Sequence, residues 1–285
     1  MKILKTVTGL RKQLTASSLS PLGFVPTMGA LHAGHLSLVE KAINDCPSVV
    51  VSIYVNPSQF NDPEDLKKYP RTPEEDLALL SGLMRKSDLV FMPRDKEIYP
   101  EKDTRVFDFG NLDKVMEGVH RPGHFNGVAQ VVSRLFDIVE PNIAYFGQKD
   151  FQQLTIIKEL VRQKGYKIKI IACPIVREND GLAMSSRNRL LDPLIRKNAG
   201  IIYKSLLSAS QMIKTHDIPE IKKFVSENIE SFNGFKVEYF EIVDDKNLLP
   251  VMSAGEMKSG KGYVGCIAVK AGRIRLIDNI EFPLP

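Results

Sequence analysis

The sequence predicts an α/β fold: a doubly wound, Rossmann-like parallel sheet followed by a second, smaller α+β domain. Apolar, β-branched runs alternate with segments of helical periodicity through about the first 175 residues. Because these runs are continuously apolar, they indicate parallel strands that helices cover on both faces. After residue 177, two amphipathic helices precede shorter strands of alternating polarity. We therefore expect one domain over 1–177 and another over 178–285.

The first domain contains five predicted strands, which lie at 22–27, 48–56, 88–93, 143–147 and 167–174. Thr72 as N-cap and Pro73 at the first helical position predict the start of one intervening helix. Segment 127–139 is apolar on nearly all sides, which predicts a deeply buried helix. Gly165 is placed to end the helix predicted over 151–165.

The second domain is predicted to contain helices near 192–214 and 218–231, and strands at 235–244, 263–270 and 273–280. Between the first two strands lies GEMKSGKG, 255–262, whose glycines and lysine have the spacing of a phosphate-binding P-loop. Gly262 replaces the Ser or Thr that holds Mg²⁺, and a predicted strand follows where a helix is needed. The overlapping GxGxxG pattern at 260–265 fails in the same way. We expect a flexible hairpin here.

Composition narrows the class of ligand and the compartment. The formal net charge is +5, from 39 basic and 34 acidic residues spread along the chain. This favours an anionic small molecule over a nucleic acid, whose usual footprint is a basic cluster. Three scattered cysteines without CxxC spacing predict buried thiols in a reducing compartment. With no signal-like leader and no apolar run near the roughly 20 residues of a membrane span, we expect a cytoplasmic protein without a membrane partner.

The segment VPTMGALHAGH, 25–35, is the strongest indication of chemistry. It places His32 and His35 where the first predicted strand passes into a helix, with Gly29 and Gly34 beside them. Zinc binding would need further ligands, and the other histidines form no matching helical pair. A structural role for buried histidines fits poorly with flanking glycines. At the carboxyl end of a strand, beside a helix N-terminus, the two imidazoles instead suit the binding of phosphate.

Two more polar segments follow predicted strands. GQKDFQQ, 147–153, offers a lysine and an aspartate before a helix, and MSSRN, 184–188, offers two hydroxyls and a guanidinium. Taken singly, these features can be explained as a helix cap, a solvated turn or an arginine in a surface salt bridge. Because three polar segments follow three strands of one sheet, we expect them to converge on a single crevice.

An HxGH motif followed by a later Lys- or Ser/Arg-bearing loop resembles the nucleotidyl-transferring superfamily that includes class I aminoacyl-tRNA synthetases. Six motifs occur in order between about residues 22 and 190: PTMGALHAGH, SIYVNPSQF, YPRT, RPGHFNGV, YFGQKDFQQL and GLAMSSRN. As a set, they are similar to the pantothenate synthetase (pantoate–β-alanine ligase) family. LIDN at 276–279 also fits, whereas 195–270 is less distinctive.

The resemblance implies ATP-dependent condensation of D-pantoate with β-alanine in pantothenate biosynthesis. The pantoate carboxylate would attack the α-phosphorus of ATP, giving pantoyl adenylate and pyrophosphate, and the β-alanine amine would then displace AMP. A carboxylate is ionised at neutral pH, so no activated Ser or Cys is required. The family also implies Mg²⁺ accompanying ATP without a dedicated metal site, a homodimer, no nucleic-acid partner, and a smaller domain that closes over the nucleotide-binding catalytic domain.

By the resemblance, His35, His32 and Lys149 are catalytic, Gln59 and Gln153 bind pantoate, and Gln59 also receives β-alanine. Lys149 would place a charge on phosphate and Asp150 would contact the ribose or the metal, while Val176 would contact adenine through its main chain. The implied ATP-binding residues are Met28, Gly29, Ala30, Leu31, His32, Ala33, Gly34, His35, Gly147, Gln148, Lys149, Asp150, Val176, Met184, Ser185, Ser186 and Arg187.

Some interpretations stay open at this point. Arg121 in RPGHF either contacts pyrophosphate or belongs to a turn before the buried helix. Asp62, Glu64 and Asp65 fit a solvated loop better than a lid. The rival functions are adenylyl transfer to a phosphorylated acceptor, RNA binding and a catalytically dead scaffold. The first would favour extra Arg or Lys beside the acceptor, where the sequence instead has glutamines.

Overall fold

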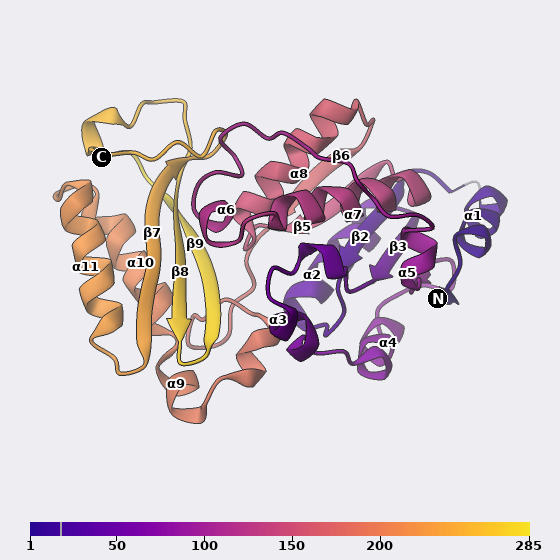
Figure 1. Cartoon of the computed structure of the whole chain (residues 1–285), viewed down its shortest axis with the longest axis horizontal. Helices are drawn as coiled ribbons and strands as arrows, with labels where there is room; N and C mark the ends of the chain where they lie inside the picture. The colour runs from indigo at the N-terminus through magenta and orange to yellow at the C-terminus, as the bar shows by residue number, and fades with distance from the viewer. Residues whose placement is uncertain (18) are drawn as a thin grey trace. The chain divides into compact units, whose positions relative to one another are not determined.

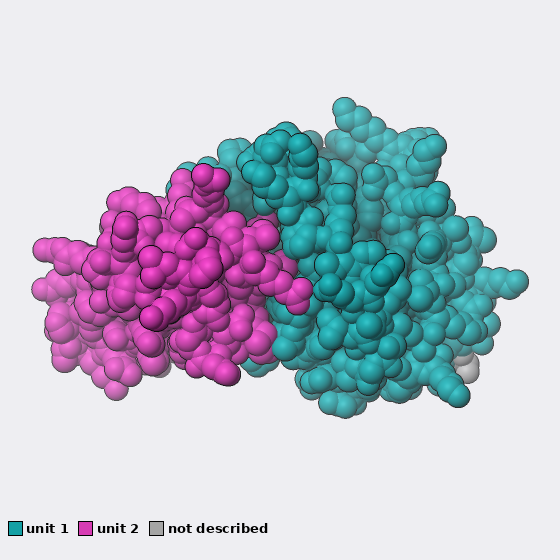
Figure 2. Space-filling model, turned by 90° about the horizontal axis from the view of Figure 1, so that it is seen from below, with its two compact units in different colours: residues 1–113, 118–148, 153–174 teal, residues 114–117, 149–152, 175–285 magenta. Residues whose placement is uncertain are grey.

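A computed structural model describes residues 1–17 and 19–285, and the chain divides into two compact units (Figures 1 and 2). Unit 1 comprises Met1–Asp113, Gly118–Gln148 and Gln153–Pro174. Unit 2 comprises Lys114–Glu117, Lys149–Gln152 and Ile175–Pro285. Two short segments from the first part of the sequence therefore belong to unit 2.

Continuous apolar runs form a parallel sheet in unit 1, as predicted, but the sheet has six strands and not the five expected. Its strands are β1 (Lys2–Leu4), β2 (Leu22–Thr27), β3 (Ser48–Ile53), β4 (Leu89–Phe91), β5 (Ile143–Gly147) and β6 (Lys169–Cys173). They lie in the order β1-β4-β3-β2-β5-β6, and every neighbouring pair is parallel. β1 was not predicted, because this short edge strand is partly exposed and does not form a buried apolar run.

Both faces of this sheet are buried. Phe24, Val50 and Phe146 belong to one apolar cluster, while their neighbours Val25 and Tyr145 belong to another on the opposite face. The first cluster includes side chains of α1 (Val7–Ala16), α7 (His124–Val139) and α8 (Phe151–Lys164), and the second those of α2 (Ala33–Asp45) and α4 (Pro73–Ser81). This confirms the doubly wound sheet and the buried helix predicted over 127–139 (Figure 1).

Short helices complete unit 1: η1 (Pro57–Gln59), α3 (Pro63–Lys68), α5 (Asp95–Ile98) and α6 (Glu117–His120), which begins at the last residue of a unit 2 segment. The acidic stretch expected to be a loop is α3, with Asp62 as its N-cap and Pro63 at its start. The expectation of a loop was wrong because Asp-Pro is itself a helix-start signal.

Unit 2 is built around an antiparallel sheet of β7 (Phe235–Asp244), β8 (Tyr263–Ala271) and β9 (Ile274–Phe282), in that order. Apolar side chains of α10 (Ile201–Met212) and α11 (Ile218–Glu230) pack with the sheet in one core (Figure 1). The single helix predicted near 192–214 is two, α9 (Pro193–Asn198) and α10. The chain turns between them at Gly200, where an added Cβ would lie 2.6 Å from the Asp180 carbonyl oxygen.

The glycine-rich segment 255–262 precedes β8, so a strand follows it as predicted. It does not form a simple hairpin, because the long connection between β7 and β8 contains η3 (Ala254–Glu256) and makes its own turns. Unit 2 also includes η2 (Ser186–Leu190).

An ion pair explains why segment 114–117 belongs to unit 2. The Arg275 guanidinium on β9 donates two hydrogen bonds to the Glu117 carboxylate, at 2.8 and 2.7 Å. The Tyr239 hydroxyl on β7 donates a third, at 2.7 Å. Hydrogen bonds of this charge-assisted, bidentate kind are strong and directional, so they fix this segment on the sheet of unit 2.

The three cysteines, Cys46, Cys173 and Cys266, are buried free thiols. Burial raises the pKa of Cys173 above its ordinary value, which disfavours the reactive thiolate form. Across 1–17 and 19–285, none of the helices combines the length and apolar character that crossing a bilayer requires.

Candidate active site

The strand order of unit 1 reverses at β2, which pairs with β3 on one side and β5 on the other. In open α/β sheets, ligands bind outside the carboxyl ends of the strands at such a switch point. The segment Met28–His35 follows β2, and the segment beginning at Gln148 follows β5. Two of the three predicted polar segments thus begin at neighbouring strands. β6, which precedes the third, also pairs with β5.

The two histidines of HxGH lie at the N-terminus of α2. His32 is the N-cap, and its Nδ1 accepts a hydrogen bond from the Gly34 N–H at 3.2 Å. The neutral imidazole of His32 therefore carries its proton on Nε2 and can donate it to a ligand oxygen. The His35 ring lies beside it, with ring centroids 4.1 Å apart. Both rings are partly exposed. This arrangement combines imidazole donors with the positive end of a helix dipole, which suits an anion.

A buried carboxylate fixes the turn that precedes these histidines. Asp76 on α4 is 1% exposed and accepts hydrogen bonds from the N–H groups of Ala30 at 3.0 Å and Leu31 at 2.7 Å. Gly29 and Ala30 have φ values of +79° and +49°. A Cβ on Gly29 would lie 2.8 Å from Asp76 Oδ2, so glycine is required by both conformation and space.

Asp76 was not predicted as a site residue. It appears in the sequence as one of three acids in the first turn of a helix, a common pattern for solvated charges. The available signal was its position one helical turn before the fully buried Leu80. An acid on the apolar face of a helix is expected to have a buried partner.

Gln59 lies beside the HxGH turn, within unit 1. Its Nε2 is 2.9 Å from Met28 Sδ, and its Oε1 accepts from Asn56 Nδ2 at 3.3 Å. Asn56 is 1% exposed, and its Oδ1 accepts from the Tyr99 hydroxyl at 3.0 Å. The structure therefore brings a predicted pantoate residue next to a predicted ATP residue. The structure also places Asn56 in contact with Gln59, and the sequence analysis assigned no role to Asn56.

In the segment after β5, Gln148 is the last residue of a unit 1 segment and Lys149 is the first of a unit 2 segment. The Gln148 N–H donates to the Cys173 carbonyl oxygen of β6 at 2.8 Å. The Lys149 carbonyl oxygen accepts from Asn279 Nδ2 in β9 at 2.8 Å, and its ammonium is 3.4 Å from Asp150. Such a partly exposed ion pair is weak, so the Lys149 ammonium can leave Asp150 and bind a phosphate instead at little cost in free energy.

The two neighbouring glutamines at the start of α8 have different surroundings. Gln152 is 4% exposed, donates to the Val115 carbonyl oxygen at 2.8 Å and accepts from the Glu117 N–H at 3.0 Å, all within unit 2. Gln153, the residue predicted to bind pantoate, begins the next segment of unit 1 and is partly exposed.

The third predicted segment lies in unit 2 and is folded back on itself. The Met184 N–H donates to the Val176 carbonyl oxygen at 3.0 Å, which brings together two residues predicted to bind ATP. Ser185 caps η2 by accepting from the Arg187 N–H at 3.3 Å.

Arg177 anchors this loop. Its guanidinium donates to the Asp278 carboxylate at 2.6 and 3.1 Å and lies 3.7 Å from the centre of the Tyr203 ring. Burial raises the pKa of Asp278, and the Arg177 charge opposes that shift. Asp278 and Asn279 belong to the LIDN motif, so β9 holds both the Arg177 loop and the Lys149 main chain.

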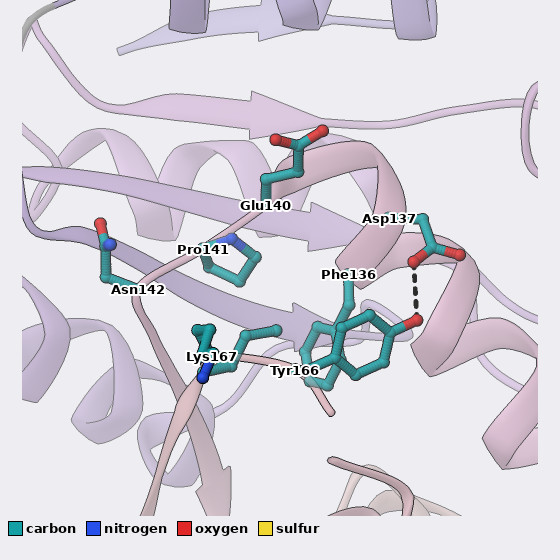
Figure 3. A pocket seen from close by; sticks show the side chains of 8 residues that line it. Phe136, Asp137, Glu140, Pro141, Asn142, Tyr166 and Lys167 are labelled. Carbon is teal, nitrogen blue, oxygen red and sulfur yellow. Dashed lines mark hydrogen bonds between the residues drawn. The ribbon is translucent and has the colours of Figure 1, made fainter. Parts of the chain in front are cut away.

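Two cavities of unit 1 lie at opposite edges of its sheet. One of about 360 Å³ is lined by Met28, Gly29, Asp76 and residues that follow β3 and β4, and so opens at the carboxyl edge. The other, of about 380 Å³, is lined by residues around 140–142 and 166–168 that precede β5 and β6 (Figure 3). It lies at the amino edge, where open α/β sheets do not bind their substrates.

In the described part of the chain, no group of three or more His, Cys, Asp or Glu side chains is arranged to hold a metal ion.

Comparison with known proteins identifies the family. The family model of pantoate-beta-alanine ligase matches residues 2–281. The chain is 50% identical to the pantothenate synthetase of Bacteroides thetaiotaomicron over 284 residues, covering 99% of both chains. It is 47% identical to that of Porphyromonas gingivalis W83, again over 99% of both.

Solved structures agree. Pantothenate synthetase from Thermus thermophilus superposes with a TM-score of 0.90 at 42% identity, over 99% of this chain and 100% of that one. A pantoate-beta-alanine ligase from Francisella tularensis, in complex with beta-gamma ATP and β-alanine, gives a TM-score of 0.79 at 33% identity, over 99% and 97%. These matches favour neither adenylyl transfer to a phosphorylated acceptor nor RNA binding. The chain belongs to the pantoate–β-alanine ligase family and is an ATP-dependent ligase that forms pantothenate.

Proposed function

We propose that this ligase activates pantoate as an acyl adenylate on the HxGH turn. A pantoate carboxylate oxygen attacks the α-phosphorus of ATP, and the bond to the β-phosphate oxygen breaks to release pyrophosphate. The β-alanine amine then attacks the carbonyl carbon, and AMP leaves with the bonding electrons while the amine loses a proton. The observation that carries the proposal is the imidazole pair at the N-terminus of α2, next to Gln59.

The HxGH turn is proposed to stabilise the charge that develops at phosphorus. The Nε2–H of His32 and the ring of His35 lie together at a helix N-terminus, and the turn is held in advance by Asp76. Donors that are already oriented before reaction stabilise a transition state at little reorganisation cost. ATP is proposed to bind along Met28–His35 and Gly147–Gln148.

Gln59 is proposed to bind pantoate and then β-alanine, with Gln153 as a second pantoate ligand. The amide of Gln59 donates to the Met28 thioether, which is a weak acceptor. Replacing this sulfur by a pantoate oxygen as the acceptor would give a stronger hydrogen bond. An amide both donates and accepts, which matches a hydroxyl and a carboxylate without fixed charge. The complex of the Francisella relative with an ATP analogue and β-alanine supports binding of both here.

Unit 2, which contains the whole of the second predicted domain, is proposed to close over this site. Unit 2 also takes in Lys149, Asp150 and Val176 from the first predicted domain, and together with the Met184–Arg187 segment these residues are predicted to bind ATP. Closure would add a lysine and an arginine to the triphosphate and exclude water from the mixed anhydride. Mg²⁺ is proposed to accompany ATP, since Mg²⁺ is commonly held by few protein carboxylates and by substrate phosphates. A homodimer in the cytoplasm is proposed from the family alone.

Isotope exchange tests the adenylate route. We expect the purified enzyme to exchange labelled pyrophosphate into ATP only when pantoate is present, and without β-alanine. Exchange with phosphopantetheine in place of pantoate would contradict the assigned acceptor. Release of ADP with pantoate would mean an acyl-phosphate route and would overturn the adenylate.

A further inference from the structure

The RPGHF motif has a defined place in unit 1 that the proposed chemistry does not use. His124, the first residue of α7, is 5% exposed. Its Nδ1 is 2.7 Å from the carbonyl oxygen of Gln59, and its Nε2 is 3.1 Å from Nη1 of Arg121. The ring therefore connects the substrate-side turn after β3 with the turn that begins α7.

Both neighbours require the same form of the imidazole. A carbonyl oxygen can only accept, so Nδ1 of His124 must carry a proton and donate it. A guanidinium can only donate, so Nε2 must be unprotonated and accept. Gln59 and Arg121 together select the neutral ring with its proton on Nδ1. With both nitrogens engaged, this histidine is poorly placed to transfer protons to substrate.

Close packing also fixes the turn that contains Gln59. The contact comes from Gly127, which lies one helical turn after His124 in α7. A Cβ added to Gly127 would clash with the Ser58 carbonyl oxygen and would lie 2.8 Å from Gln59 Cα. The Gly127 carbonyl oxygen accepts from Asn56 Nδ2 at 3.1 Å. The NPSQF and RPGHFNGV motifs are thus packed together. Within this contact, His124 and Gly127 fix the main chain on either side of the Gln59 side chain.

We propose that His124 is a positioning residue for Gln59, and that Arg121 selects the tautomer in which it acts. His124 acts through the Gln59 carbonyl, and so sets the direction of the amide that binds pantoate. This inference rests on the proposed role of Gln59. It assigns Arg121 a function within unit 1 that requires no contact with pyrophosphate.

Two amide replacements distinguish the two ring nitrogens. In His124→Asn the side-chain nitrogen occupies roughly the place of Nδ1 and still donates to Gln59. In His124→Gln the amide corresponds to Nε2, and this bond is lost. We expect the pantoate KM to rise roughly 10-fold in His124→Gln and to stay within about 3-fold in His124→Asn, as for loss or retention of one buried hydrogen bond. The KM for ATP should change little in either variant.

A double-mutant cycle separates this inference from the proposed function. If His124 acts through Gln59, His124→Gln has no further effect on the pantoate KM in a Gln59→Ala background. His216→Gln, at an exposed site of unit 2, is the matched control. Equal effects of the Asn and Gln replacements, or additive effects in the cycle, would overturn the inference. A Gln59→Ala enzyme with a normal pantoate KM would instead overturn the proposed role of Gln59.

Discussion

His35→Ala and Lys149→Ala are each expected to lower turnover by about 100-fold or more while leaving the thermal midpoint within about 2 °C of the parent. Removing an oriented donor from a charge that develops at phosphorus costs activation free energy at the transition state alone. Both side chains are partly exposed, so we expect their truncation to cost little stability. Steady-state kinetics and calorimetry on the same preparations measure the two effects separately.

His216→Ala and Lys214→Ala provide matched controls, because both residues are exposed in unit 2. Each is expected to keep parental turnover. A fall of many degrees in the midpoint of His35→Ala would support a structural role for the HxGH histidines, which the flanking glycines disfavour. Normal turnover in Lys149→Ala would remove this lysine from the phosphate site.

Asp76→Ala is expected to damage both stability and catalysis. The substitution leaves the Ala30 and Leu31 N–H groups buried without their acceptor, and each such loss costs about 1–3 kcal/mol. We expect the free energy of unfolding to fall by about 2–4 kcal/mol. The HxGH turn would lose its fixed shape, so kcat/KM for ATP should fall by about 100-fold.

Asp76→Asn keeps one acceptor oxygen and should be intermediate in both measurements. Glu74→Ala, in the same helical turn but exposed, should match the parent. If Asp76→Ala lowered stability with no change in kcat/KM for ATP, the turn would be a purely structural element and its proposed role in binding ATP would be wrong.

The fold could be predicted where the local sequence pattern matched the burial of the residues in the tertiary structure. The apolar run at 48–56 predicts a buried parallel strand, and the structure places β3 at Ser48–Ile53 with Val49, Val50 and Val51 fully buried between two layers of helices. β1 could not be predicted, because an edge strand of this length has no second neighbour to bury it. The break at Gly200 depends on the approach of Asp180, which helical periodicity does not encode.

The same limit applies to the site. The candidate ligand-binding segments stand out in the sequence because HxGH and its companion motifs combine special residues at fixed spacing. The residues that hold these segments in place could not be predicted. Asp76 holds N–H groups 45 and 46 residues away, and Asn279 holds a carbonyl 130 residues away. Such residues look like ordinary surface or strand positions until the fold brings their partners to them.

A crystal structure with a non-hydrolysable ATP analogue and pantoate tests the central claim most directly. We predict one cleft in which the imidazoles of His32 and His35, the ammonium of Lys149 and the guanidinium of Arg187 contact the same triphosphate. The pantoate carboxylate should lie about 3–3.5 Å from the α-phosphorus, within reach of Gln59. A triphosphate that contacted Lys149 and Arg187 but lay away from the HxGH turn would contradict the account.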